Sequence, residues 1–397
     1  MQGFDLKAPP PGFVEDPWPV YAWLRAAAPC HPQPDGSVIL SRHADLDLVY
    51  RDTARFISDK RAVFAPKFGA GSPLYTHHTT SLVFNDPPLH GRVRAIMVGA
   101  MSPRALASLE PGLVALVDRL LDGLAAQEVV DLIEGFAAAI PIEVIGNLFA
   151  IPTAERGPLR DWSLAILGAL EPTLTAAQMD WGNRSVRAFR AYLADLVARR
   201  RAAPGDPETD VLTRLMQSDR GALSPEELYQ NCIFILNAGH ETTTNLIGSA
   251  LALLAEWPDQ RARLLAEPEL IATAVDEVLR FESPNQLGNR LTTETVVFHG
   301  VEVPPGTDIH LVIGAANRDP ARFENPDRLD LARRPNKHLA FAGGAHTCVG
   351  LSLARMEGRV AILRFLQRFP AYRLLPGATR GGRLRFRGWA TLPAQLS

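Results

Sequence analysis

The sequence predicts a mainly α-helical protein with a small β portion. Alanine, leucine and arginine recur at helical spacing between residues 103 and 220. No proline lies between Pro225 and Pro258, so this stretch has room for one helix of about thirty residues, or about 50 Å. Runs that alternate like strands are short and lie near the N-terminus and over residues 296–312.

The β portion is predicted from turn signals beside short apolar runs. Asp35-Gly36 is a turn signal ahead of the apolar run Val38–Leu40. The stretch Val296–Val312 alternates like a hairpin. We therefore expect a β-rich portion at roughly residues 1–60 and 285–315, with helices in the remainder.

The helical remainder contains recognisable breaks but no linker. The stretch 103–220 is interrupted near four residues, Pro141, Pro152, Pro172 and Gly205. A second helical stretch runs from Asp259 to Arg280, and a long coil covers Asn317–His338. No Ser/Gly tract, charge block or internal repeat separates one half from the other. We expect a single domain over residues 1–397.

Composition excludes several classes of function. Lys and Arg number 41 against 43 Asp and Glu, a formal net charge of -2, so nucleic-acid binding has no electrostatic support. Three cysteines, Cys30, Cys232 and Cys348, are too few for a disulfide framework and suit a reducing compartment. The first thirty residues hold no apolar run typical of a signal peptide or membrane span. We expect a cytoplasmic, monomeric protein without a membrane anchor.

The stretch from about Asp52 to Thr80 is predicted to be irregular. It mixes basic and aromatic residues with glycines and prolines. A mobile loop that covers a substrate and an ordinary surface loop both agree with this composition, and the residues alone leave both open.

The long central helix is predicted to begin at a capping box and to contain a polar interruption. Ser224 caps, Pro225 occupies the first turn and Glu227 completes the box. The interruption, Ala238–Thr243, lies in an otherwise apolar stretch, and Gly239 alone costs about 1 kcal/mol relative to alanine. It is either a structural irregularity, with threonines bonding to preceding carbonyls, or a catalytic acid and hydroxyl pair.

The most informative stretch is Phe341–Gly350, which contains Cys348. Gly343 and Gly344 permit a close approach to a flat ligand. The following apolar residues recur at helical spacing up to Pro370, which places Cys348 at or just before a helix N-terminus, where the helix dipole lowers a thiol pKa. The alternative, an ordinary buried cysteine, does not account for the ordered Phe, Gly, His, Cys and Gly around it.

This stretch resembles the haem-thiolate loop of the cytochromes P-450, and the resemblance covers nearly the whole chain. The interruption Ala238–Thr243 resembles the family's oxygen-binding helix, and Asn317–Asp327 resembles its meander. Ala342 departs from the pattern, because a glycine usually follows the loop's phenylalanine. The resemblance implies the cytochrome P-450 fold, a triangular helical prism with haem between the long central helix and the helix after the cysteine loop.

The resemblance also implies roles for individual residues. Cys348 is expected to be the axial ligand of the haem iron, Thr242 and Glu241 to supply the hydrogen bond and protons at the distal side, and Glu277 with Arg280 to form a structural pair. The other expected cofactor-binding residues are Ala238, Gly239, Phe341, Gly343 and Gly350. The expected propionate contacts are His90, Arg94, Arg290 and His346.

The function implied is that of a haem b (iron protoporphyrin IX) monooxygenase acting on a small, largely apolar substrate by hydroxylation, epoxidation or O-dealkylation. The sequence holds no flavin, nicotinamide or iron–sulfur motif, so a ferredoxin or flavodoxin with its NAD(P)H reductase is expected to supply electrons. A peroxide-driven enzyme is a close variant, and a non-catalytic haem-thiolate sensor or carrier is the alternative class. Candidates for the electron-transfer face are Arg92, Arg104, Lys337, Arg355 and Arg359.

Substrate contacts are expected by position from two segments. They are Phe234, Asn237 and Ala238 on the central helix, and Gln286, Leu287 and Gly288 after Arg280. Asn237 and Gln286 are expected to bond a polar group. Lys60, Arg61 and Lys67 either attract a carboxylate or face water.

Overall fold

The computed structural model is mostly helical with small sheets, which confirms the predicted fold class. It describes residues 3–101, 103–217 and 223–396. The chain divides into two compact units. The first unit consists of Met1–Ile57, Leu113–Ala138 and Thr242–Ser397, and the second of Ser58–Gly112 and Ala139–Glu241. The prediction of a single domain stays a prediction.

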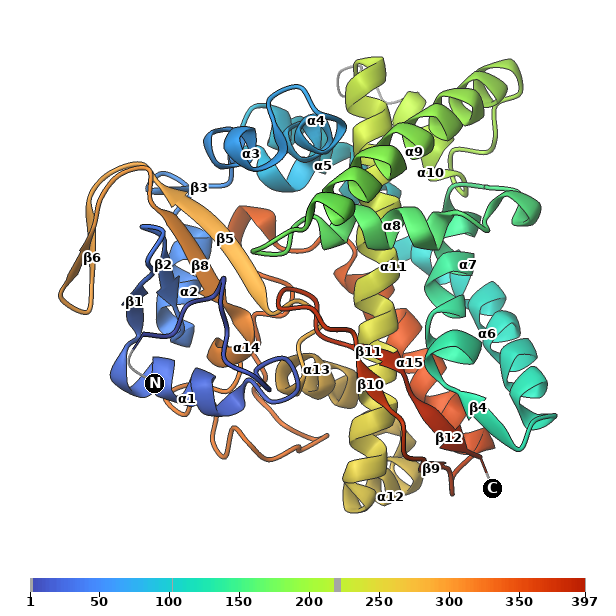
Figure 1. Ribbon diagram of the computed structural model, residues 1–397. Coiled ribbons are helices and arrows are strands. Elements are labelled where there is room, and N and C mark those ends of the chain that lie inside the picture. Colours follow the sequence, from blue (N-terminus) through green and yellow to red (C-terminus); the bar gives the residue numbers. More distant parts are fainter. Residues whose placement is uncertain (1–2, 102, 218–222, 397) are drawn as a thin grey trace. The chain divides into compact units, whose positions relative to one another are not determined.

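The first unit contains a five-stranded sheet in the order β1-β2-β8-β5-β3. These strands are Cys30–Pro32, Val38–Leu40, Asp308–Val312, Leu287–Thr292 and Phe56–Ile57. The β2–β8 pair is parallel and the other pairs are antiparallel. As predicted, β1 and β2 form a hairpin, whose turn contains Gly36 at φ 84°. Figure 1 shows α2 beside this sheet.

The remaining elements of the first unit surround the cysteine loop and the C-terminus. The helices are α1 (Trp18–Ala27), α2 (His43–Arg51), α12 (Pro258–Ala266), α13 (Ile271–Phe281), α14 (Ile313–Ala316) and α15 (Leu351–Arg368). The smaller sheets pair β6 (Val296–Phe298) with β7 (Val301–Val303), β10 (Thr379–Arg380) with β11 (Trp389–Thr391), and β12 (Pro393–Gln395) with β4 (Val129–Asp131) and β9 (Arg373–Leu374).

The second unit is helical. Its helices are α3 (Arg61–Phe68), α4 (Pro73–Thr80), α5 (Leu89–Ala100), α7 (Ala139–Leu148), α8 (Leu159–Gly168), α9 (Ala176–Ala202) and α10 (Val211–Met216). Two further helices, α6 (Pro103–Ala125) and α11 (Pro225–Glu256), have residues in both units.

The prediction of an irregular segment from about Asp52 to Thr80 is wrong. Helices α3 and α4 occupy most of it. Phe64, Phe68 and His78 are buried and their rings pack on one another, with centroids between 5.1 and 5.7 Å apart. The aromatic residues therefore form a small core, which gives these short helices the packing that their sequence alone does not predict.

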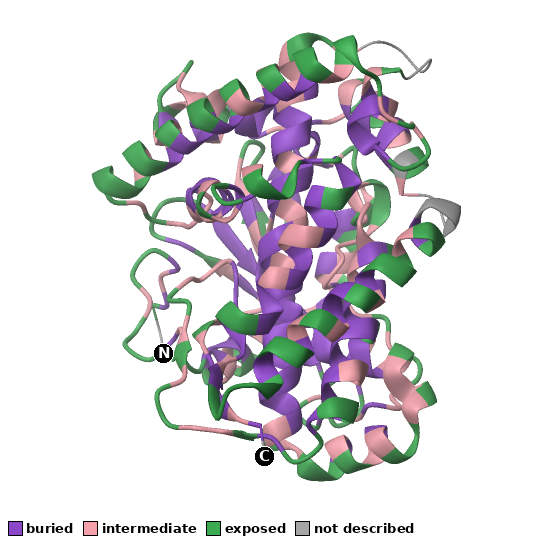
Figure 2. Cartoon of the chain, turned by 90° about the vertical axis from the view of Figure 1, so that its right-hand side faces the viewer, coloured by how far each residue is buried: buried purple, intermediate pink, exposed green. Residues whose placement is uncertain are grey.

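The central helix α11 forms as predicted. The Ser224 amide lies 2.8 Å from Glu227 Oε2, and the Glu227 amide lies 3.2 Å from Ser224 Oγ, so the capping box is present. The helix continues to Glu256, and most of its residues are buried. Figure 2 shows the buried residues in the interior and the exposed residues on outer helix faces.

Two other predictions are confirmed and one is corrected. Helix α15 starts at Leu351 and ends at Arg368, before Pro370, and residues 317–338 hold no regular helix or strand. Only β6 and β7 form the hairpin predicted over Val296–Val312. Strand β8 instead pairs with β2 and β5 in the five-stranded sheet. Strand β2 belongs to the distant N-terminal part of the chain, so the local sequence pattern did not report this pairing. Within the described residues, no helix is both long and apolar enough to span a membrane.

Candidate active site

The cysteine loop of the first unit ends just before α15. The backbone amide of Cys348 donates to the carbonyl oxygen of Phe341 at 3.0 Å, which closes the loop. The Cys348 side chain is exposed, whereas Cys30 and Cys232 are buried. Burial raises the pKa of the Cys30 thiol to about 11. Cys348 is therefore the one cysteine of the three whose sulfur is placed to meet a ligand.

Glycine at position 344 is required by contact with α2. Gly344 has φ 63°, and a Cβ added there would lie 2.1 Å from the backbone oxygen of Tyr50. At Gly343 the corresponding distance is 3.3 Å, to Tyr50 Cβ. We expected these glycines to permit approach to a flat ligand. At Gly344 the closest atoms belong to helix α2, so the glycine serves first to seat the loop on that helix.

Phe341, at the start of the loop, contacts a residue of helix α15. The Arg355 guanidinium lies 4.9 Å from the centroid of the Phe341 ring, and its Nε donates to Asp276 Oδ1 at 2.8 Å. His338 also contacts Asp276, at 3.5 Å, and packs on Phe341. Burial opposes the charge, but hydrogen bonds from His338 and Arg355 leave the pKa of Asp276 below its ordinary value. Sequence reasoning missed Asp276, whose only signal was its place beside Glu277.

Two of the predicted propionate contacts belong to the first unit. Arg290 on β5 is buried, its guanidinium lies 5.2 Å from the Tyr50 ring centroid, and it donates to the Asn289 carbonyl at 2.7 Å. His346 is half-buried in the short 3-10 turn Gly344–His346 of the loop. A fixed, largely desolvated guanidinium suits a carboxylate ligand.

The other two predicted propionate contacts belong to the second unit. His90 and Arg94 lie one turn apart on α5, with His90 buried and Arg94 half-buried. They share a helix face because of their i, i+4 spacing. Their role, like that of Arg290 and His346, stays a prediction.

A half-buried stripe runs along the interruption in α11. The half-buried residues are Phe234, Ala238, Gly239 and Thr242, whereas the residues between them are buried. Their spacing places them on one face of the helix. A Cβ added at Gly239 would lie 2.6 Å from Ile145 Cδ1 of α7, so a side chain there would need Ile145 to move. The stripe therefore presents one aromatic ring, two small residues and one hydroxyl.

The two side chains beside Thr242 in the interruption are buried. Glu241 is 6 % exposed and His240 is 3 % exposed. Burial, with a smaller contribution from the positive charge of Arg160, lowers the pKa of His240 to about 3. His240 is therefore neutral near pH 7.

The predicted structural pair is a buried ion pair on α13. Arg280 Nε lies 2.8 Å from Glu277 Oε2, and both side chains are fully buried. Glu277 also accepts from Arg333 and Asn336 at 3.1 Å and from the Asp330 amide at 3.0 Å. These partners come from the coil before the cysteine loop.

The substrate candidates separate into two groups. Phe234 and Ala238 belong to the half-buried stripe. Asn237 is buried, and its Oδ1 accepts from Ser163 Oγ of α8 at 2.8 Å. This contact occupies the amide oxygen, whereas Nδ2 has no hydrogen-bond partner among the described residues, so the expected bond to a substrate's polar group stays a prediction.

The candidates after Arg280 have protein neighbours on the sides that the structure describes. Gln286 is buried, donates to the Ser283 carbonyl at 2.7 Å, and its Oε1 leaves no space for a side chain at Gly314. Leu287 packs in the hydrophobic cluster of Tyr21 and its neighbours. A Cβ added at Gly288 would lie 2.3 Å from the Tyr50 hydroxyl oxygen, so this position has no room for a side chain. Gln286 and Leu287 therefore lie among protein side chains, and their role in substrate binding, like that of Gly288, stays a prediction.

The basic residues at positions 60–67 contact the protein itself. Arg61 pairs with Asp59 and donates to Asn85 Oδ1 at 3.0 Å. Lys67 Nζ donates to the Glu171 carbonyl at 2.6 Å. Lys60 is 1 % exposed. Lys60 is buried and Lys67 is held by a carbonyl oxygen of the second unit, whereas Arg61 is exposed and faces water in part, as one of the two interpretations expected.

The candidates for an electron-transfer face also differ in their surroundings. Arg92 pairs with Glu227, and Arg355 pairs with Asp276. Lys337 and Arg359 are exposed. The Arg104 side chain lies outside the described residues. Exposed Lys337 and Arg359 therefore remain the candidates in the first unit.

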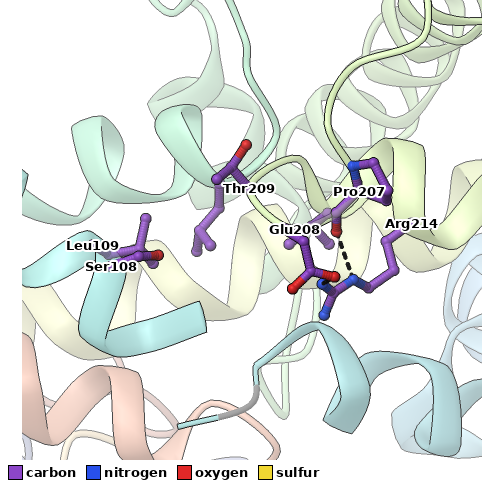
Figure 3. A pocket seen from close by; sticks show the side chains of 8 residues that line it. Ser108, Leu109, Pro207, Glu208, Thr209 and Arg214 are labelled. Atoms are coloured by element: carbon purple, nitrogen blue, oxygen red, sulfur yellow. Dashed lines mark hydrogen bonds and ion pairs between the residues drawn. The ribbon is translucent and has the colours of Figure 1, made fainter. Parts of the chain in front are cut away.

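The hollow drawn in Figure 3 is too small for a substrate. It lies in the second unit beside Ser108, Pro207 and Arg214, and its volume is about 10 Å³. A cavity of that size holds at most one water molecule. Arg214 Nε closes one side by donating to the Pro207 carbonyl at 2.7 Å.

These observations fit a haem. One exposed thiol ends a closed loop, a buried guanidinium is fixed nearby on Tyr50, and a helix carries a half-buried stripe of small residues beside an acid and a hydroxyl. A haem-thiolate oxygenase needs this set of donors.

Comparison with known proteins gives the same class. The family model described as cytochrome P-450 matches residues 170–372. Vitamin D(3) 25-hydroxylase of Pseudonocardia autotrophica is 37% identical over 369 residues, covering 92% of this chain and 89% of that protein. The biotin biosynthesis cytochrome P-450 of Bacillus subtilis (strain 168) is 34% identical over 367 residues, covering 91% of both.

Solved structures agree with the sequence relatives. CalO2 has a TM-score of 0.92 at 31% identity, covering 100% of this chain and 99% of that chain. P450BioI, solved with an acyl carrier protein that carries hexadec-9Z-enoic acid, has a TM-score of 0.91 at 32% identity, covering 96% and 99%. The chain belongs to the cytochrome P-450 family. It is an oxygenase enzyme, its family implies a haem cofactor, and the predicted family and P-450 fold are confirmed.

Proposed function

We propose that this protein is a haem b monooxygenase in which Cys348 is the axial thiolate. The observation that carries the proposal is the exposed Cys348 sulfur at the end of a loop closed by the Cys348–Phe341 hydrogen bond. When bound, the haem supplies dioxygen activation, because a thiolate ligand donates electron density that favours O–O cleavage. Arg290, His346, His90 and Arg94 are proposed to hold the propionates, since carboxylates taken from water need charged or hydrogen-bonding partners.

On the distal side, Thr242 and Glu241 are proposed to hold and deliver protons. They are neighbours in one continuous helix, so their side chains leave its axis about 100° apart. Thr242 is half-buried and belongs to the stripe, whereas the Glu241 carboxyl is buried. The hydroxyl is therefore placed to hydrogen-bond a ligand, and the carboxyl to pass protons to that position through water.

The substrate proposed is small and largely apolar. The stripe on α11 presents Phe234, Ala238 and Gly239, and basic residues Arg61 and Lys67 are occupied by protein contacts. Two similar proteins support an apolar substrate. One relative is named as a vitamin D(3) 25-hydroxylase, and one structural neighbour was solved with myristic acid. Hydroxylation, epoxidation and O-dealkylation all suit such a substrate.

The electron donor proposed is a ferredoxin or flavodoxin with its NAD(P)H reductase. Lys337 and Arg359 are exposed cations of the first unit that an acidic carrier protein would meet. Reconstitution with a surrogate ferredoxin system, dioxygen and a panel of terpenoids, steroids and fatty acids tests the proposal. Product that carries one labelled oxygen atom from dioxygen supports it. Ligand binding without any turnover would favour a carrier.

The variant Thr242→Ala tests the proton-delivery role. We expect electron consumption to continue while product falls several-fold and hydrogen peroxide rises, because protons no longer reach the distal side in step with the electrons. The matched control is Thr243→Ser at the adjacent buried threonine, which should keep the coupling of the parent enzyme. Unchanged coupling in Thr242→Ala would refute the role and leave a peroxide-driven enzyme as the better assignment.

A further inference from the structure

The first unit contains a second cavity, and none of the residues proposed to bind haem lines it. Its volume is about 250 Å³, against about 30 Å³ for one water in the liquid. One wall is the C-terminal part of α11, where Ser249, Leu253 and Glu256 recur at helical spacing. Ser249 follows Thr242 by two turns, roughly 10 Å along the helix. The cavity is large enough for a small organic molecule.

The walls of this cavity are rich in tryptophan. The chain has six tryptophans, and three of them, Trp18, Trp257 and Trp389, line this one cavity. All three are half-buried. The Arg318 guanidinium covers one face of Trp18, and the Arg380 guanidinium lies over Trp389 at 3.8 Å from its ring centroid, so the exposed parts of these two rings lie on their remaining surfaces. Indole rings offer extensive apolar faces at little conformational cost, which is why they are enriched where ligands bind. A flat aromatic ring is the shape that such walls accept.

The charges that line the cavity cancel. They belong to Glu256, Glu282, Arg318 and Arg380. Glu282 is buried and contacts Arg380 Nη1 at 2.9 Å, and Arg318 lies against the Trp18 ring at 3.4 Å from its centroid. An ionic ligand would add a net charge to a partly desolvated site, which is costly. The lining therefore favours an uncharged ligand.

Hydrogen-bonding groups of both kinds remain available on the lining. Among the described residues, the buried Ser249 Oγ and Trp389 Nε1 have no hydrogen-bond partner, and Arg380 Nη1 makes only its ionic contact with Glu282. The exposed Glu256 carboxylate has no ion pair in the part of the chain that the structure describes. Buried polar groups without partners are rare in folded proteins and need an explanation. A ligand with both a donor and an acceptor would satisfy them.

We propose that this cavity is a second ligand site for an uncharged, flat aromatic molecule that carries a hydrogen-bond donor and an acceptor. The aromatic ring packs among the three tryptophans. The acceptor faces Arg380 and the Trp389 N–H, and the donor faces Glu256 or Ser249. The proposal does not depend on the chemistry proposed at Cys348.

Calorimetric titration of the haem-loaded protein tests the ligand class with three isosteric probes. Benzamide is uncharged and carries a donor and an acceptor, whereas benzoate and benzamidine are an anion and a cation near pH 7. We expect benzamide to bind once per protein and each charged probe to bind at least tenfold more weakly. The haem absorption spectrum should stay unchanged during the benzamide titration.

Two variants locate the binding. Ala252→Leu fills the cavity from its α11 wall, where Ala252 is buried, and should abolish benzamide binding. Glu256→Gln changes only an exposed side chain, keeps the fold, and should weaken binding about tenfold, as expected for loss of a hydrogen bond to a charged group. The control Glu302→Gln, at an exposed position of β7, should change nothing.

Four results would overturn the proposal. The first two are no binding of benzamide up to its solubility limit and equal binding of the three probes. The third is benzamide binding that neither Ala252→Leu nor Glu256→Gln changes. The fourth is benzamide binding that shifts the haem absorption spectrum in proportion to occupancy.

Discussion

At the residue scale, Ala342 stands where the family resemblance leads us to expect a glycine. It has φ 56°, in the left-handed region that favours glycine, and its methyl group packs against the hydrophobic cluster of Leu46 and Val49. Backbone strain of this kind costs about 1–3 kcal/mol. The loop therefore keeps the path that a glycine would take, and the methyl contact offsets part of the strain.

Ala342→Gly should leave the free energy of unfolding within about 0.5 kcal/mol of the parent value. Relief of backbone strain stabilises the variant, whereas the loss of methyl burial and the greater freedom of its unfolded chain destabilise it by a similar amount. The control Ala340→Gly removes a methyl from a residue without positive φ and should cost about 1 kcal/mol. Denaturant titration of the haem-loaded proteins measures both. Equal losses in the two variants would show that Ala342 carries no strain.

Local sequence patterns predicted individual site residues, but they did not predict which distant residues these contact. The Ser224–Glu227 capping box and the position of Cys348 before a helix follow from spacing alone. The contacts of Tyr50 with Gly344 and of Asp276 with Arg355 join residues far apart in the chain, so no local pattern reports them.

At the element scale, α13 is tied to the coil that precedes the cysteine loop. Arg280 donates to the carbonyls of Asn317 and Pro326, and Glu277 accepts from Arg333 and Asn336. A coil with no regular structure gains fixed partners in this way. The ion pair thus supports the segment that leads to Cys348.

Glu277→Ala should lower the free energy of unfolding by about 3–5 kcal/mol, because it leaves the buried Arg280 and the half-buried Arg333 guanidinium groups without their carboxylate. The exposed Glu269, just before α13, supplies the control: Glu269→Ala should stay within about 0.5 kcal/mol. Thermal and denaturant unfolding measure both. A loss below 1 kcal/mol for Glu277→Ala would contradict the supporting role.

Helices α3 and α4 show why element prediction failed at one place. Pro66 lies inside α3, and Gly69 and Gly71 separate it from α4, so local signals point to a break. The helices are stabilised by distant contacts: the Leu74 amide donates to Asn183 Oδ1 at 3.1 Å, and Leu74 packs where Gly182 has no side chain. Tertiary packing overrides propensity here.

At the scale of the whole molecule, one buried carboxyl links stability to pH. Glu357 on α15 is 2 % exposed, and its Oε2 has no hydrogen-bond partner among the described residues. Burial raises the pKa of Glu357 to about 8. Between its unfolded pKa, about 4.5, and about 8, the folded state holds one more proton than the unfolded state. This group therefore makes the protein less stable as pH rises through that window.

Glu357→Gln removes this proton linkage. The stability of the variant relative to the parent should rise between pH 5.5 and pH 7.5, by about 1.4 kcal/mol per pH unit at most. Unfolding at the two pH values, with Glu128→Gln at an exposed position as control, measures the effect. A relative stability that is the same at both pH values would show that Glu357 is ionised in the folded protein.

The proposed function requires a bond between the Cys348 sulfur and a haem iron, and the absorption spectrum of the reduced, carbon monoxide-bound protein tests that bond. The parent protein should show the red-shifted Soret band that a thiolate ligand produces. Cys348→Ser should lose it, while Cys30→Ser, at a buried cysteine of β1, should keep it. A parent protein without the red-shifted band, or a Cys348→Ser variant that retains it, would contradict the account.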